Sequence, residues 1–215
     1  MVALSIRRRL SGAVLLLAAA LLMQACASEV PSPPSGRALQ VPGQGIVVGS
    51  LGLVFGNSSP DLRTAIISQA TVSIFVRPVG GGLGDDLSFT TTQQARGTPG
   101  LERVTDTDRR LLFFRALPPG RYVVWRRTGS LINSTYNVPD GDRGLHFTVR
   151  AGEVTYIGAH EVAAYSHRDW LGVTSPGTAG LSVVDDVDDD RRHFYHLHPE
   201  LRGLPFADAL QGGAQ

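Results

Sequence analysis

From residue 45 onward, the hydrophobic pattern is typical of short β-strands. Between 70 and 76, apolar residues alternate with other residues, which places one face of an extended strand in a core. Further runs rich in β-branched and apolar residues lie at 46–55, 86–92, 111–117, 122–127, 145–149, 154–162, 171–173 and 181–184. Short strands at this even spacing, separated by glycine and proline, predict a mainly β chain with an antiparallel β-sandwich over residues 45–184.

Two short turns join neighbouring strands in this prediction. The turn at 118–120, Pro-Pro-Gly, follows the run that ends at Leu117, and the turn at 151–153, Ala-Gly-Glu, follows the run that ends at Val149. Proline fixes φ and glycine accepts the positive φ that a tight reversal needs. The sequence therefore predicts two β-hairpins at these positions.

The pattern changes to that of a helix after residue 185. The apolar residues Val187, Phe194, Leu197 and Leu201 recur at spacings that place them on one helical face. Acidic residues lie in the first turns, and arginines and histidines lie in the last turns, as the helix dipole favours. Pro199 marks the predicted end of the helix. We predict one helix within residues 185–210, packed on the sandwich.

The first 25 residues have the features of an export signal. Three arginines at 7–9 precede an uncharged run at 13–23, and the small Ala25 comes just before Cys26, the only cysteine of the chain. The segment resembles a bacterial lipoprotein signal peptide. The resemblance implies cleavage before Cys26, which would then carry a diacylglyceryl group and an N-acyl chain. Two or more acyl chains anchor a protein stably in a membrane.

Two alternatives remain for this segment. The first is a transmembrane helix that is not cleaved, although such a helix needs roughly 20 apolar residues and the run at 13–23 is shorter. Ordinary secretion is also possible, because residues 25–27 fit the small-x-small pattern of the other signal peptidase and Met23 stands where lipoproteins usually have leucine. By the same resemblance, the lack of an aspartate after Cys26 implies the outer membrane rather than the inner.

Residues 26–44 are predicted to form a tether. Prolines at 31, 33, 34 and 42 lie among serine and glycine, and no hydrophobic period appears. A flexible chain of this length spans roughly 25 Å on average. The expected order is thus a signal peptide at 1–25, a disordered tether at 26–44, the sandwich at 45–184, and the helix and tail at 185–210.

Two segments carry a further family resemblance. Residues 114–124 (FRALPPGRYVV) and 147–158 (FTVRAGEVTYIG) are similar to strand–turn–strand units of prealbumin-like, carboxypeptidase-regulatory-like domains in uncharacterised bacterial lipoproteins. The resemblance extends from about 70 to 162. It implies a prealbumin-like sandwich and a binding, spacer or accessory role rather than catalysis.

All twenty basic residues are arginines. Without lysine, the chain cannot form a Gly-Lys-Ser/Thr phosphate loop, a Schiff base or a Ser-x-x-Lys acylation site. The glycine-rich stretch at 45–52 is therefore predicted to be a strand whose glycines admit close neighbours. After loss of residues 7–9, seventeen arginines oppose nineteen acids, a net charge of about −2, so we expect no nucleic-acid partner.

Metal and hydrolase motifs are incomplete. His193 and His196 share a helical face but His198 points elsewhere, and the acids of 185–190 lack the glycine and glutamate of a calcium loop. His160 begins a His-Glu pair without a second histidine at the zinc-protease spacing, and no Gly-x-Ser-x-Gly occurs. We predict no metal, no cofactor and no catalytic residue.

Aromatic residues are the remaining candidates for a binding site. Those that can stack on a sugar or peptide are Trp125, Tyr136, Tyr156, Tyr165 and Trp170. Trp125 and Tyr156 lie inside apolar strands and are predicted to be in the core. Tyr165 and Trp170, just beyond a strand end, are the candidate ligand-binding residues.

These observations favour a non-catalytic lipoprotein of the bacterial cell envelope, anchored in the membrane through Cys26. Its sandwich would offer loops or an edge strand to an envelope protein, because edge strands recruit extended peptides. A second hypothesis is a carbohydrate- or peptidoglycan-binding module that uses exposed aromatics near Trp170. A hydrolase with a non-standard site is a third.

Overall fold

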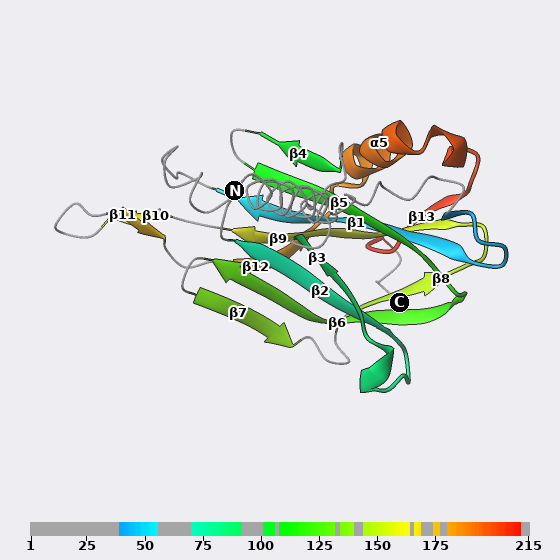
Figure 1. The fold of residues 1–215 in the computed structure, drawn as a ribbon, viewed down its shortest axis with the longest axis horizontal. Coiled ribbons are helices and arrows are strands. Elements are labelled where there is room, and N and C mark those ends of the chain that lie inside the picture. Colours follow the sequence, from blue (N-terminus) through cyan, green and yellow to red (C-terminus); the bar gives the residue numbers. More distant parts are fainter. Residues whose placement is uncertain are drawn as a thin grey trace, which may run out of the picture. The chain divides into compact units, whose positions relative to one another are not determined.

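Two β-sheets packed face to face, with one α-helix near the C-terminus, make up the main body of the described structure (Figure 1). The structure, a computed structural model, describes residues 39–55, 70–91, 101–105, 108–131, 134–139, 144–163, 166–168, 174–176 and 180–211. All of them belong to a unit that extends from Ser32 to Gln215. The predicted mainly β-sandwich fold with a C-terminal helix is confirmed.

Sheet A contains six strands in the described part of the chain, in the order β12-β9-β1-β5-β4 with β13 also beside β9. Their bounds are β1 Gly45–Val54, β4 Glu102–Val104, β5 Asp108–Leu117, β9 Val154–Ala163, β12 Gly180–Val184 and β13 Phe206–Asp208. The α-helix, α5 (Val187–Leu197), contacts β1, β5 and β9 of this sheet.

Sheet B contains five described strands, in the order β3-β2-β6-β7 with β8 also beside β6. Their bounds are β2 Thr71–Pro78, β3 Leu87–Thr90, β6 Gly120–Leu131, β7 Ser134–Pro139 and β8 Leu145–Val149. The remaining elements are the ribbon of β10 (Ser166–Arg168) and β11 (Thr174–Pro176) and the short 3₁₀ helices η1 (Leu83–Asp85) and η3 (Pro199–Leu201).

Strand pairing is antiparallel, as predicted, except around β9. This strand runs parallel to β1 and to β13. The sequence could not show this, because β1 and β9 are both nearly continuous buried apolar runs and such a run looks the same in either direction. Sheet A is therefore a mixed sheet.

Both predicted hairpins are wrong. The Pro-Pro-Gly turn at 118–120 leads from β5 in sheet A to β6 in sheet B, and the turn at 151–153 leads from β8 in sheet B to β9 in sheet A. A tight turn reverses the chain in a hairpin and in a connection between sheets alike. The Tyr122 hydroxyl closes the first connection by donating a 2.9 Å hydrogen bond to the carbonyl oxygen of Pro118.

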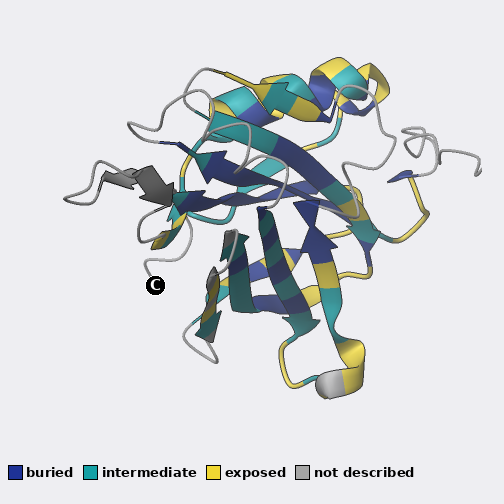
Figure 2. Ribbon diagram, turned by 60° about the vertical axis from the view of Figure 1, so that its left-hand side comes forward, coloured by how far each residue is buried: buried dark blue, intermediate teal, exposed yellow. Residues whose placement is uncertain are grey.

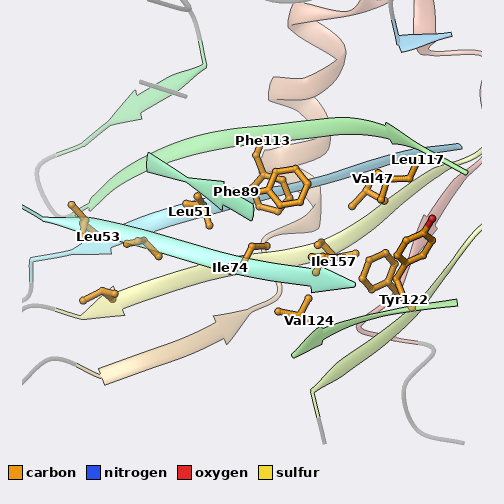
Figure 3. Close-up of a cluster of buried hydrophobic side chains, with 14 of the residues drawn as sticks. Val47, Leu51, Leu53, Ile74, Phe89, Phe113, Leu117, Tyr122, Val124 and Ile157 are labelled. Atoms are coloured by element: carbon orange, nitrogen blue, oxygen red, sulfur yellow. The ribbon is translucent and has the colours of Figure 1, made fainter. Parts of the chain in front are cut away.

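The main core lies between the two sheets (Figure 3). Val47, Leu51 and Phe113 of sheet A meet Ile74 and Phe89 of sheet B, and each of these side chains is at most 2% exposed. The rings of Phe89 and Phe113 lie 4.5 Å apart between centroids. Each such buried side chain contributes on the order of 1.5–3 kcal/mol of hydrophobic free energy.

A second core lies between α5 and the outer face of sheet A. Phe194 of α5 and Leu201 of η3 are fully buried against Val48 and Tyr156, and Figure 2 shows that the opposite side of the helix is exposed. Sheet A is thus covered on both faces. This explains why β1 is buried along almost its whole length, whereas β2 of sheet B alternates between buried and half-buried residues.

The prediction of close approach at the glycines of 45–52 is confirmed at Gly49. A Cβ atom there would lie 2.6 Å from Cζ of Phe113 and 2.7 Å from the carbonyl oxygen of Gly158. Gly158 has φ +98° and lies where the register between β1 and β9 shifts. The glycine-rich stretch is therefore a strand and not a phosphate loop.

Candidate functional site

Three predicted site residues, Cys26, Tyr165 and Trp170, lie outside the described residues. Their roles in lipidation and in ligand binding stay predictions. Within the ranges that the structure describes, no helix combines the length and the hydropathy needed to cross a bilayer.

The outer face of sheet B carries aromatic and arginine side chains. They are Phe75 and Arg77 of β2 and Trp125 and Arg126 of β6, all half-buried, and we call this group the stacked face. The described helix α5 does not cover this side, since it packs on the outer face of sheet A, away from sheet B (Figure 2). The stacked face is therefore an open surface of the described structure.

The predicted burial of Trp125 in the core is wrong. The register between β2 and β6 shifts at this residue, so that Phe75 faces Arg126 while Val76 faces Val124. The extra residue of such a bulge re-aims neighbouring side chains. As a result Trp125 and Arg126 both join Phe75 on the outside, whereas Tyr156 is fully buried as predicted.

Cations and rings alternate across the stacked face. The Arg126 guanidinium carbon lies 3.8 Å from the ring centroid of Phe75 and 4.8 Å from that of Trp125. Arg77 lies 4.9 Å from the Trp125 ring. Each contact is worth about 0.5–1 kcal/mol at an exposed site. The stacking holds both guanidinium groups in place, with their N–H donors in the plane of the group.

No carboxylate of the described residues forms an ion pair with Arg77 or Arg126. The two arginines are thus oriented donors without an acid partner. Guanidinium groups match carboxylates and phosphates in geometry, and aromatic rings stack on sugars. A surface with both features is suited to an acidic glycan.

A buried polar cluster lies on the opposite side of the molecule, under α5. Oδ2 of Asp190 accepts hydrogen bonds from the Ser50 hydroxyl at 2.6 Å and from the Tyr156 hydroxyl at 3.1 Å. The backbone N–H of Asp186 donates to the Tyr156 oxygen at 3.2 Å. Burial is the main cause that raises the pKa of the Asp190 carboxyl and of the Tyr156 hydroxyl.

Ion pairs extend this cluster to the start of α5. The Arg110 guanidinium lies between the carboxylates of Glu161, at 2.5 Å, and Asp186. Arg103 of β4 reaches Asp186 at 3.1 Å and Asp189 at 3.0 Å. Desolvation raises the pKa of Glu161, and the nearby charge of Arg110 opposes that rise.

This cluster holds α5 on sheet A, and its buried groups are not accessible to a substrate. Ser50, Tyr156 and Asp190 are each at most 3% exposed, and their polar atoms bond to one another. Sequence reasoning missed Ser50 and Asp190. Two signals were available: Ser50 interrupts an apolar strand, and Asp190 lies four residues before Phe194 on the apolar face of the helix.

The histidines of the tail have different surroundings. His196 is exposed, His193 is half-buried, and His198 is 4% exposed with its ring 4.7 Å from that of Phe114. Burial lowers the pKa of His198, and Glu200 opposes this. Among the described side chains, no three His, Cys, Asp or Glu residues converge as metal ligands do.

No family model, curated protein or solved structure matches this chain. The lipoprotein and carboxypeptidase-regulatory-like resemblances therefore stay predictions. Function has to be inferred from the residues themselves.

Proposed function

We propose that this chain is a non-catalytic binding module of the bacterial envelope, anchored through a lipidated Cys26, that binds an acidic glycan through the stacked face of sheet B. The observation that carries the glycan assignment is the pair Arg77 and Arg126, stacked on Phe75 and Trp125 without an acid partner in the described structure. Peptidoglycan, whose peptides carry carboxylates, belongs to this ligand class.

The assignment as a binding module is supported by the contrast between the two outer faces. On sheet A, α5 covers the polar cluster, and its serine, tyrosine and carboxylates bond to one another. On sheet B, rings and guanidinium groups face outward. This contrast favours recognition by the outer face of sheet B over chemistry at the buried cluster.

The anchoring assignment is supported by the export pattern before Cys26 and by the Pro-rich segment that follows it. Replacing Cys26 with serine tests it. Native protein should fractionate with membranes and show the mass of an acylated cysteine, whereas the Cys26→Ser protein should leave the membrane fraction. An unmodified native N-terminus downstream of Cys26 would contradict lipidation.

Binding is tested by sedimentation with insoluble peptidoglycan and with an acidic polysaccharide gel. Trp125→Ala and Arg126→Gln should each weaken retention about tenfold, because one stacking surface or one charged donor is lost. Arg115→Gln removes an exposed arginine of sheet A as the matched control and should bind normally. Trp170→Ala tests the residue predicted from the sequence. Retention unchanged by Trp125→Ala would exclude the stacked face as the site.

A further inference from the structure

The outward side of α5 and η3 borders a cavity that the proposed function does not use. Its volume is about 570 Å³, and its described walls are Asp188, Arg191, Arg192, Tyr195 and Arg202. Among the four residues from α5, Asp188 and Tyr195 each lie three and four positions from Arg191 and Arg192, so the four share one face. The volume lies within the range of small-ligand sites.

The charge of these walls is mainly positive. Three arginines face one acid, Asp188. Arg192 pairs with Asp189, whereas Arg191 and Arg202 have no carboxylate partner in the part of the chain that the structure describes. The Arg191 guanidinium carbon lies 4.9 Å from the ring centroid of Phe206 and 5.8 Å from that of Tyr195, which orients it.

Tyr195 adds a second and independent observation. This residue is 8% exposed, and its buried hydroxyl has no hydrogen-bond partner among the described residues. A buried donor without an acceptor costs about 1–3 kcal/mol. A shift of the exposed Arg191 side chain, which lies over the Tyr195 ring, would open the hydroxyl to the cavity, where a ligand oxygen would supply that acceptor.

We propose that this cavity binds the phosphate group of a phosphate ester. Guanidinium groups bind phosphate through paired N–H donors, and a tyrosine hydroxyl donates a further hydrogen bond. Asp188 at the rim accepts a hydrogen bond from a hydroxyl of the alcohol that carries the phosphate. The chemistry is the same for a phospholipid headgroup and for a soluble phosphate ester.

The position of Leu39 favours the headgroup as the source. Leu39, the first described residue, packs in the same apolar cluster as Phe194, Tyr195 and Leu201. The described part of the domain therefore begins on the side of α5. This preference rests on the proposed anchoring, whereas binding of a soluble phosphate ester does not depend on it.

The test uses the purified full chain with Cys26→Ser, which keeps the cavity and removes the anchor. Calorimetric titration with inorganic phosphate and glycerol 3-phosphate measures soluble binding, and flotation with phosphatidylglycerol or phosphatidylcholine vesicles measures binding to headgroups. We expect Arg191→Gln and Arg202→Gln each to weaken binding about tenfold. Arg121→Gln, at an exposed arginine of β6, is the matched control.

Tyr195→Phe separates binding from folding. Because an unpartnered buried hydroxyl destabilises the fold, this variant should unfold at a urea concentration no lower than that of wild type while binding phosphate about fivefold more weakly. Binding of the soluble esters supports a free ligand, and binding of phosphatidylglycerol vesicles alone supports the headgroup. If neither binds, or if Arg121→Gln weakens binding as much as Arg202→Gln, the proposal is overturned. If Cys26 proves not to be lipidated, the titrations with inorganic phosphate and glycerol 3-phosphate still test the cavity.

Discussion

The Ser50 hydroxyl donates a 2.6 Å hydrogen bond to Oδ2 of Asp190, joining the middle of β1 to α5 across 140 positions of sequence. Both side chains are almost fully buried, and Tyr156 donates to the same oxygen. A specific polar contact therefore accompanies the apolar packing of Phe194 in holding the helix on sheet A.

Replacing Asp190 with alanine should lower the free energy of unfolding by about 2–4 kcal/mol, because two buried hydroxyls lose their common acceptor. Urea denaturation of the purified protein measures this. The matched control is Asp188→Ala, an exposed acid of the same helix, which should change stability by less than about 0.5 kcal/mol. Equal losses in the two variants would show that the Asp190 contact is unimportant.

The raised pKa of Asp190 predicts how stability depends on pH. Because burial makes the folded protein bind this proton more tightly than the unfolded chain, the group's contribution is fully present below its ordinary value of 3.8 and is lost as the pH rises through the folded pKa. Relative to Asp190→Asn, wild type should therefore gain stability as the pH falls from 7 towards 4. Urea midpoints at several pH values measure the difference, and parallel profiles for the two proteins would contradict it.

His198 should act in the opposite sense. Burial lowers its pKa, so its contribution is present above the ordinary value of 6.5 and is lost as the pH falls through the folded pKa. His198→Phe keeps an aromatic ring beside Phe114 and Phe194 but removes the titration. Wild type should lose stability relative to this variant as the pH falls below about 6.5. A constant difference between the two proteins would show that His198 does not titrate differently on folding.

The strands and the helix could be predicted where a hydrophobic pattern defines them. The alternation at 70–76 became β2, and the apolar face of the tail became α5. Edge strands such as β4 and β7 were not predicted, because Glu102–Val104 and Ser134–Pro139 have few apolar residues. Their partners hold them mainly by backbone hydrogen bonds, which every sequence can form.

The features that the sequence did not predict depend on contacts between residues that are far apart in the sequence. In the sequence, the acidic residues at the start of α5 are typical of a solvent-exposed helix face. In the fold, they contact Arg103, Arg110 and Ser50. Trp125 looked like a core residue because 122–125 is apolar throughout, but Val124 faces the core, so that alternation turns Trp125 outward. The bulge that adds Arg126 to the same face depends on the pairing with β2. The Cys26→Ser and Trp170→Ala experiments test two of the residues predicted from the sequence, and the role of Tyr165 stays a prediction.

The close approach at Gly49 predicts a strong penalty for one added carbon. In Gly49→Ala, Cβ would lie 2.6 Å from Cζ of Phe113 and 2.7 Å from the carbonyl oxygen of Gly158. Neighbours in a packed core yield only at a cost, so the variant should lose about 1–3 kcal/mol of stability.

Gly180→Ala is the control for this prediction, because a Cβ on that residue of β12 has no atom within 4 Å. It should be within about 0.5 kcal/mol of wild type. Phe113→Leu should relieve part of the Gly49→Ala penalty, since the smaller side chain lacks the ring atom nearest the new carbon, and a double-mutant cycle measures that coupling. If the effects of Gly49→Ala and Phe113→Leu simply add, the contact between the neighbouring strands β1 and β5 does not limit the size of residue 49.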